Sequence, residues 1–166
     1  MAIKKKLNHW DWAPLEYDKK KWKQKFQDNL KRRKKWIKDD KTYQFAIFRK
    51  SDGAYIGIVS LMDISRELFQ NAYLGYHIFN MFWGQGYAFE AAQAVIKYGF
   101  KTLNLHRIEA GIEPKNKRSI ALAKRLNMNY EGLSKRRLLL GGKWIDLKLF
   151  VALSEDYGVK WKAKKK

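Results

Sequence analysis

The sequence contains no cysteine and only three histidines among its 166 residues. The lack of cysteine excludes a disulfide framework, a thiol nucleophile and a zinc site with cysteine ligands. It also fits the reducing conditions of the cytoplasm. The histidines form no cluster with acidic residues at the spacing of metal ligands, and no Ser, His and Asp residues form a nucleophilic constellation. We therefore expect a cytoplasmic protein that holds no metal.

Long apolar runs are also missing. No stretch approaches the roughly 18 apolar residues that a membrane-spanning helix needs, and no apolar segment follows the basic start, Met1 to Lys6, as it would in a signal peptide. We expect no association with a membrane. The 46% hydrophobic content, with seven Trp, nine Tyr and nine Phe, excludes a disordered chain. We expect one domain over residues 1–166, with a frayed basic tail at about 158–166.

Acidic residues are scarce. Sixteen Asp and Glu stand against 36 Lys and Arg, which gives a formal net charge of +20. Such a charge attracts polyanions, including RNA and acidic proteins, and would allow association with the ribosome. A well-solvated surface explains the same charge, because the lysines are spread over most of the chain. Both interpretations stay open.

Apolar residues recur at helical spacing in some segments and at strand spacing in others, which indicates an α/β protein. Trp22, Phe26 and Leu30 lie four residues apart and predict a helix. Glycines in the short ranges 51–53 and 141–142 each mark a hairpin between two strands. The predicted helices cover 18–38, about 88–103 and 117–126, the predicted strands cover 43–49, 54–62, 72–79, 106–112, 128–140 and 143–153, and a polar connection covers 63–71.

One glycine-containing stretch organises the chain. Trp83-Gly84-Gln85-Gly86-Tyr87-Ala88 lies between a predicted strand and a predicted helix. Glycine lets the backbone come close to a ligand, since it has no side chain. Successive backbone N–H groups at a helix N-terminus attract an anion, and the helix dipole adds to that attraction. The stretch therefore predicts a phosphate-binding turn, although glycines used only for packing would give the same pattern.

Two common phosphate motifs do not fit this stretch. A Walker loop closes with Gly-Lys-Ser or Gly-Lys-Thr, but Gly86 is followed by Tyr87. A dinucleotide fingerprint needs a third glycine where this chain has Phe89, and no acidic residue follows at the distance of a ribose ligand. Neither a Walker nucleotide site nor a dinucleotide site is therefore expected.

Three later segments follow the turn in order: Leu105 to Ala110, Glu113 to Ser119 and Leu126 to Gly132. With the glycine turn they make the chain resemble the GNAT superfamily of acetyl-CoA-dependent N-acetyltransferases. Within it the chain is most similar to the RimJ/RimL type, which acetylates the N-terminal amine of ribosomal proteins. The resemblance runs from about Trp10 to Tyr157. It implies an α/β fold with a mixed, mostly antiparallel sheet and helices on both faces.

The chain departs from the family pattern at its start. Related proteins begin with another strand and a short helix before the segment that matches Trp10. Either the sheet lacks its first strand, or residues 2–8 replace it. A missing strand leaves an exposed edge, which invites pairing with a second chain. Both a monomer and a homodimer therefore agree with the resemblance.

The resemblance also implies a cofactor site. The backbone N–H groups of the turn, in Gly84, Gln85, Gly86, Tyr87 and Ala88, would bind the pyrophosphate of acetyl-CoA. Ile78 lies at the end of the strand along which the pantetheine arm runs in GNAT proteins. Trp83 replaces the Gln or Arg with which the family's loop usually starts, and so removes one polar contact to phosphate. Asn116 is expected to contact the cofactor, and it also suits the N-cap of the next helix.

Ser119 is the candidate proton donor. It matches a serine that lies near the cofactor sulfur in RimL-like enzymes, where a hydroxyl can donate to the leaving thiolate. Many GNAT enzymes place a tyrosine further along this helix, but this chain has Ala123 there. An ordinary serine in the first turn of a helix would give the same pattern.

Glu109 is the candidate general base. It is an acid within an apolar strand, and burial raises the pKa of a carboxyl group toward neutrality. A structural ion pair with Arg107, which shares its face, explains the residue equally well. Asp63 and His77 are weaker candidates, since a histidine in such a place is more often a packing residue.

We therefore expect an N-acetyltransferase that uses acetyl-CoA and acts on a protein N-terminus. A polyamine or an aminoglycoside-like antibiotic is the alternative acceptor, and a basic RNA- or ribosome-binding protein on an acetyltransferase scaffold is the alternative from another class. Trp10 and Trp12 correspond to an aromatic segment near the acceptor groove of related enzymes and are expected to bind substrate. The basic run from Lys31 to Lys35 and the lysine-rich tail are the expected RNA contacts.

Overall fold

The computed structural model describes the backbone of residues 19–163 and the side chains of residues 27–163. The predicted substrate contacts Trp10 and Trp12, and the expectation about the first strand, lie outside these residues. The elements, of which η1 and η2 are short 3-10 helices, follow in the order α1 (Lys19–Lys38), β1 (Tyr43–Phe48), β2 (Tyr55–Ser65), β3 (Asn71–Ile78), η1 (Asn80–Phe82), α2 (Tyr87–Lys101), β4 (Arg107–Ile112), α3 (Lys117–Arg125), β5 (Asn129–Leu140), β6 (Lys143–Leu153) and η2 (Glu155–Tyr157).

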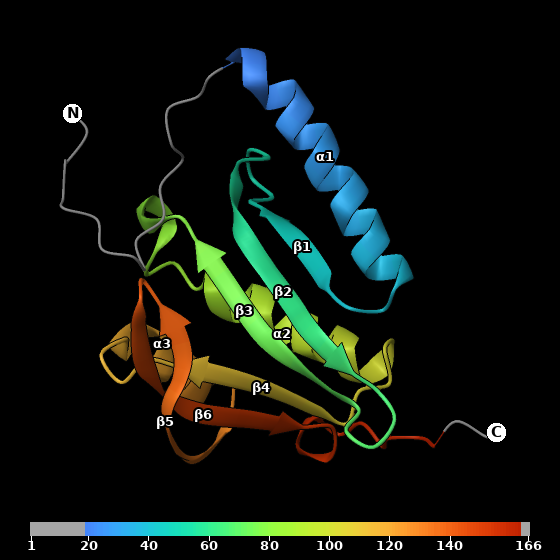
Figure 1. The fold of residues 1–166 in the computed structure, drawn as a ribbon, viewed down its shortest axis with the longest axis vertical. Helices are drawn as coiled ribbons and strands as arrows, with labels where there is room; N and C mark the ends of the chain where they lie inside the picture. The colour runs from blue at the N-terminus through green and yellow to red at the C-terminus, as the bar shows by residue number, and fades with distance from the viewer. Residues whose placement is uncertain (1–18, 164–166) are drawn as a thin grey trace.

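The strands form one sheet in the order β1-β2-β3-β4-β6-β5 (Figure 1). Every neighbouring pair is antiparallel except β3 and β4, which are parallel. A parallel pair needs a crossover connection, and here the glycine turn and α2 provide it. The predicted α/β class and the mixed, mostly antiparallel sheet are therefore confirmed.

The parallel pair is short. β3 and β4 are in register only from Asn71 with Arg107 to Tyr73 with Glu109. Beyond Tyr73 the two strands diverge, as their arrows show in Figure 1. Residues 74–78 of β3 therefore have no strand partner on the β4 side, and their backbone groups there need other hydrogen-bond partners. The candidate site lies beside this unpaired part of β3.

α2 lies behind the sheet in the view of Figure 1 and supplies the centre of the core. Its buried stripe contains Ala92, Ile96 and Phe100, which recur at four-residue spacing. A Cβ added at Gly99 would lie 2.8 Å from Cδ1 of Ile108, so a larger residue there would require core side chains to shift. This packing fixes the N-terminus of α2 against the end of β3.

α1 runs along β1 at one edge of the sheet, as Figure 1 shows. Its end is fixed by the N–H of Lys41, which donates to the carbonyl of Trp36 at 2.9 Å. The second half of the helix is basic, and its exposed residues include Lys31, Arg32, Lys34, Lys35 and Lys38. Among the described residues, no helix has both the length and the apolar character to cross a membrane.

Most predicted boundaries agree with the structure within one or two residues. The predicted polar connection at 63–71 is wrong, because β2 continues to Ser65. The register shifts between Met62 and Ser65, and Asp63 has a φ of 50°. This bulge turns Ile64 into the core, where only 4% of its surface is exposed.

Part of the tail that was expected to fray is hydrogen-bonded. The indole N–H of Trp161 donates to the carbonyl of Asn104 at 3.0 Å. The side chain of Asn104 also accepts from the N–H of Lys162 at 3.3 Å and donates to its carbonyl at 2.8 Å. The last residues, 164–166, lie outside the described part of the chain.

Candidate active site

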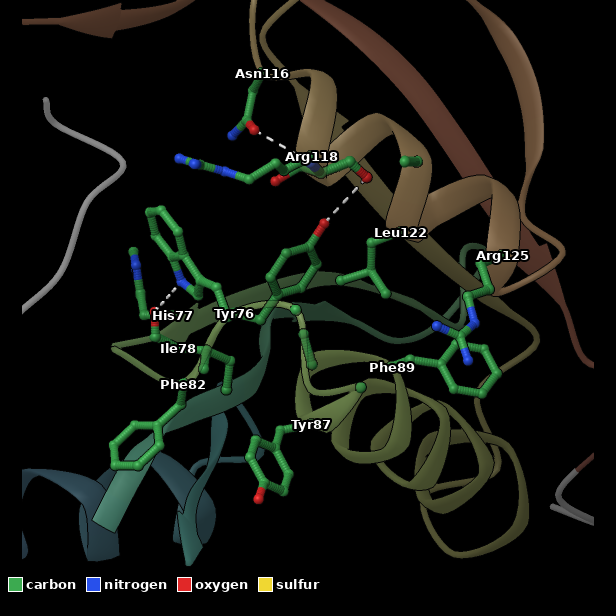
Figure 2. A pocket seen from close by; sticks show the side chains of 16 residues that line it. Tyr76, His77, Ile78, Phe82, Tyr87, Phe89, Asn116, Arg118, Leu122 and Arg125 are labelled. Carbon is green, nitrogen blue, oxygen red and sulfur yellow. Dashed lines mark hydrogen bonds between the residues drawn. The ribbon is translucent and has the colours of Figure 1, made fainter. Parts of the chain in front are cut away.

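A cavity of about 510 Å³ lies where the carboxyl end of β3, the glycine turn, the start of α2 and α3 meet (Figure 2). The predicted cofactor residues are all among its lining residues except Gln85. Three separate segments of the sequence thus come together. The full lining is Tyr76, His77, Ile78, Phe82, Trp83, Gly84, Gly86, Tyr87, Ala88, Phe89, Asn116, Arg118, Ser119, Ala121, Leu122 and Arg125.

Two glycines give the turn its shape. Gly84 has a φ of 77° and Gly86, the N-cap of α2, has a φ of 84°. Residues with a side chain rarely adopt this left-handed conformation, so glycine is required at both positions. A Cβ added at either glycine would meet nothing within 4 Å. The turn therefore presents an open backbone surface to the cavity.

The backbone of the turn offers several hydrogen-bond donors. In the described chain, no protein acceptor receives the backbone N–H groups of Gly84, Gln85, Gly86, Tyr87 or Ala88. The ladder of α2 begins only at Phe89, whose N–H donates to the carbonyl of Gly86 at 3.0 Å. Unpaired N–H groups at the positive end of a helix dipole are suited to bind an anion. The residues present thus fit a phosphate ligand.

Trp83 lies beside the unpaired end of β3. Its indole N–H donates to the carbonyl of Ile78 at 2.7 Å. The backbone N–H of Trp83 donates to the carbonyl of Asn80 at 3.2 Å. Hydrogen bonds therefore fix both the backbone and the indole of Trp83, and the residue forms part of the cavity wall.

Two arginines of α3 also line the cavity. The guanidinium of Arg118 lies 3.7 Å from the ring centroid of Trp83, and that of Arg125 lies 4.3 Å from the ring centroid of Phe89. These arginines were not predicted as site residues, although their spacing of seven places them on one face of a helix. Among the lining residues of the described chain there is no carboxylate. The electrostatic field of the cavity therefore favours an anion.

The helix cap at Asn116 is confirmed. Its side-chain oxygen accepts the backbone N–H of Ser119 at 3.1 Å. This bond satisfies one free donor in the first turn of α3. Ser119 itself lines the cavity, so its hydroxyl is placed in the same wall as Asn116. The contacts of both residues with a cofactor stay predictions.

Tyr76 joins the two sides of the cavity and was not predicted from the sequence. Its side chain extends from β3 toward α3, and its hydroxyl donates to the carbonyl of Ser119 at 3.4 Å (Figure 2). Burial raises the pKa of this phenol above its ordinary value. The phenol therefore stays protonated at neutral pH and can hold the first turn of α3 in position.

Glu109 does not line the cavity. Its carboxylate accepts from the guanidinium of Arg107 at 2.8 Å and from the side-chain amide of Asn71 at 3.0 Å. Arg107 also pairs with Glu131, and this interaction lowers the pKa of the Glu131 carboxyl. The contacts of Glu109 agree with the structural ion pair that the sequence left open. Its role as a base stays a prediction.

Of the weaker base candidates, only His77 lines the cavity. Partial removal from water lowers the pKa of its imidazole, which favours the neutral form. Asp63 lies in the β2 bulge with its side chain exposed. No group of three or more His, Cys, Asp and Glu within the described range is arranged to hold a metal.

Residues 3–129 match the family described as acetyltransferase (GNAT) domain. The chain therefore belongs to the GNAT acetyltransferase family, and the resemblance drawn from its sequence is confirmed. Enzymes of this family transfer the acetyl group of acetyl-CoA to amines. The parallel pair that diverges beside the glycine turn carries the candidate cofactor site of this chain.

Several curated proteins are similar to the chain. It is 36% identical over 120 residues to a probable N-acetyltransferase, YjcK, of Bacillus subtilis, covering 72% of this chain and 66% of that protein. It is 32% identical over 146 residues to the ribosomal protein uS5-alanine N-acetyltransferase of Escherichia coli, covering 88% of this chain and 75% of that one. The spermidine N(1)-acetyltransferase of E. coli is 26% identical over 110 residues, covering 66% of this chain and 58% of that protein.

Solved structures show the same fold. The ribosomal-protein-S5-alanine acetyltransferase of Vibrio fischeri superimposes with a TM-score of 0.74 at 28% identity, over 93% of this chain and 82% of that one. RimJ of Mycobacterium smegmatis, in complex with CoA-disulfide, gives a TM-score of 0.75 at 24% identity, over 89% of this chain and 71% of that one. The RimJ/RimL-like character expected from the sequence agrees with these neighbours.

Proposed function

We propose that this chain transfers the acetyl group of acetyl-CoA to the N-terminal amine of a protein, such as a ribosomal protein. The observation that carries the proposal is the row of five backbone N–H groups for which no described residue is an acceptor, at an open cavity whose described lining contains no carboxylate. The similar enzyme of E. coli acts on the N-terminal alanine of ribosomal protein uS5, by its name. It covers more of this chain than the spermidine enzyme does.

The cofactor contacts follow from the cavity. The N–H groups from Gly84 to Ala88 bind the pyrophosphate, because no residue of the described chain accepts them. The pantetheine arm lies along the unpaired end of β3 near Ile78, where backbone groups lack a strand partner. Asn116 contacts the cofactor with the side chain that also caps α3.

The reaction needs a proton for the leaving thiolate. The amine attacks the thioester carbonyl, the C–S bond breaks, and the sulfur of CoA takes up a proton. The hydroxyl of Ser119 stabilises or protonates the thiolate from the cavity wall. Tyr76 is a positioning residue, since its hydroxyl holds the carbonyl of Ser119.

The acidity of the acceptor amine favours a protein N-terminus. An α-amino group has a pKa of about 7.7–8.0, so roughly a quarter of it is neutral near pH 7.4, whereas only about one in a thousand alkyl amines with a pKa near 10.4 is neutral. An alkyl amine therefore needs a general base more than an α-amine does. The described lining of the cavity contains arginines and no carboxylate, and so it also disfavours a polycation.

A small amine is the second candidate acceptor, and the similarity to spermidine N(1)-acetyltransferase is what favours it. A competition assay separates the two. The initial rates of acetyl transfer from acetyl-CoA are measured for a peptide with a free N-terminal alanine, for spermidine and for an aminoglycoside. The proposal expects the highest kcat/KM for the peptide, and a higher value for either small amine would contradict it. The alternative of an inactive RNA-binding scaffold expects no transfer to any acceptor.

The basic half of α1 supports association of the enzyme with ribosomal RNA. A ribosomal protein is usually basic and would be repelled by a chain of net charge +20 in free solution. Phosphates of RNA would attract both proteins. Four residues of the run from Lys31 to Lys35 are exposed, and only Arg33 is half-buried.

We expect sedimentation with ribosomes to weaken steeply with salt. Neutralising the run from Lys31 to Lys35 should weaken sedimentation without affecting acetylation of a short peptide. If the protein does not sediment with ribosomes even at low salt, its positive charge only keeps the surface solvated.

A further inference from the structure

We propose that Arg125, at the end of α3, binds the 3′-phosphate of the cofactor ribose. The enzyme would then prefer acetyl-CoA over a donor that lacks this phosphate. The inference rests on the proposed use of acetyl-CoA. It assigns a ligand to a cation of the cavity wall that the proposed function leaves without a role.

The side chain of Arg125 lies on the ring of Phe89. The Arg125 Cζ atom is 4.3 Å from the ring centroid, and both residues line the cavity. Phe89 is half-buried and packs against the core, so its ring offers a fixed face. Stacking on an aromatic ring restricts a long side chain and leaves the edge of the guanidinium available for hydrogen bonds. Figure 2 shows this pair at the opposite end of α3 from Asn116.

The guanidinium of Arg125 makes no hydrogen bond or ion pair with another residue of the described chain, and Phe89 is its aromatic contact. Glu90, the acid that follows Phe89 in α2, lies outside the cavity lining. Arg125 belongs to the last turn of α3, where the helix dipole favours a cation. The helix therefore needs no counter-ion for this residue, and the donors of Arg125 are available to a ligand.

The position of Arg125 points to the end of the cofactor that is remote from the thioester. Ser119, the proposed partner of the sulfur, lies in the first turn of α3, and Arg125 is the last residue of the helix. At about 1.5 Å per residue, the two lie about 9 Å apart along the helix axis.

The order of groups in acetyl-CoA agrees with this placement. The thioester lies at one end, the pyrophosphate follows the pantetheine arm, and the ribose with its 3′-phosphate lies beyond the pyrophosphate. Phe89 directly follows the proposed pyrophosphate ligands in the first turn of α2. Arg125, stacked on Phe89, therefore lies beside the pyrophosphate site, and the 3′-phosphate is the anionic group to which the turn has not been assigned.

A phosphate monoester suits this cation. It carries roughly −1.5 to −2 charges near neutral pH, more than either phosphate of the pyrophosphate can carry. A guanidinium presents paired donors that match the oxygens of a phosphate. The acceptor amine, by contrast, would be repelled by Arg125. An exposed arginine at the open end of the cavity thus fits the anion at the end of the cofactor.

The test compares acetyl-CoA with 3′-dephospho-acetyl-CoA, which keeps the thioester, the pyrophosphate and the adenosine. The Kd of each donor is measured by calorimetry. We expect the wild type to bind acetyl-CoA about five- to twentyfold more tightly, near the lower end of the range for hydrogen bonds to charged groups, because Arg125 is exposed to water. Arg125→Gln should bind both donors with the Kd that the wild type has for the dephospho donor.

Three further variants separate charge, geometry and stacking. Lys124→Gln removes the same charge from an exposed neighbour outside the cavity lining, and should keep the preference of the wild type. Arg125→Lys keeps the charge without the paired donors and should keep only part of the preference. Phe89→Leu removes the ring and should lower the preference in the wild type but not in Arg125→Gln, since Phe89 acts through Arg125.

The outcomes distinguish this inference from the proposed function. Equal Kd values for the two donors in the wild type would overturn the inference alone. An Arg125→Gln variant that weakens both donors by the same factor would also overturn it, because the lost contact would then be to a group that both donors carry. A folded wild type that binds neither donor would overturn the proposed function and this inference together.

Discussion

The side chain of Asn116 accepts the backbone N–H of Ser119 at 3.1 Å, so the residue that caps α3 also fixes the predicted catalytic serine. The bond ties the first turn of the helix to the loop that follows β4. It leaves the hydroxyl of Ser119 uninvolved in the cap, because only the backbone of Ser119 takes part. One asparagine can therefore stabilise the helix and shape the cavity.

Two substitutions of Asn116 separate its two roles. Asn116→Ala should lower stability by about 1 kcal/mol, since a lost N-cap costs roughly 0.5–2 kcal/mol. Asn116→Asp keeps the capping oxygen and should retain the melting temperature, but its negative charge at the cavity should weaken acetyl-CoA binding. Thermal melting with and without acetyl-CoA measures both effects. Unchanged binding in Asn116→Asp would leave Asn116 as a helix cap only.

Gly86 tests the phosphate-binding turn. Gly86→Glu should abolish the rise in melting temperature that acetyl-CoA gives the wild type, because the new side chain fills the open surface and repels phosphate. Gly53, in the β1–β2 hairpin, has a φ of 69° and the same open surroundings. Gly53→Glu therefore introduces the same left-handed backbone strain as Gly86→Glu, away from the cavity. This control should melt earlier without acetyl-CoA but keep the shift. Loss of the shift in both variants would point to a general folding defect.

Much of this arrangement could be predicted from local sequence patterns. The glycine turn, the Asn116 cap and the Gly141-Gly142 hairpin each depend on residues close together in the chain, and the structure confirms all three as turn, cap and hairpin. Helices and strands with regular apolar spacing were predicted for the same reason.

The remaining features depend on contacts between distant segments. The divergence of β3 and β4 after Tyr73 is set by how two strands and α2 pack, and no local pattern gives the length of their pairing. The contact of Arg118 with Trp83 joins α3 to the glycine turn. The β2 bulge that buries Ile64 follows from the demands of the core, which overrode the polar composition of that segment.

Ser119 tests the chemistry. Ser119→Ala should lower kcat by about ten- to a thousandfold, in the range of acid–base and oxyanion contributions. The Kd for acetyl-CoA and the melting temperature should change little, because the cap uses the backbone N–H. Ser119→Thr keeps a hydroxyl and should recover part of the rate. An unchanged kcat in Ser119→Ala, measured with a peptide acceptor, would show that Ser119 has only a structural role.

Glu109 tests the ion pair against the general base. Glu109→Gln should lower stability by about 1–2 kcal/mol, since it weakens a buried charge-assisted bond to Arg107. We expect the rise of kcat/KM with pH to persist in this variant, because Glu109 lies outside the cavity lining. The pH dependence of kcat/KM and thermal melting give the two readouts. Loss of the alkaline-going rise in a folded variant would instead assign the base to Glu109.

The site of acetylation within a single peptide tests the central claim most directly. The peptide carries a free N-terminal alanine and one internal lysine, and tandem mass spectrometry locates the acetyl group after reaction with acetyl-CoA near pH 7.4. The account predicts acetylation of the α-amine, the amine with the larger neutral fraction, and no product from the same peptide when its N-terminus is blocked. Acetyl transfer to the lysine, or transfer only to spermidine added to the same reaction, would contradict it.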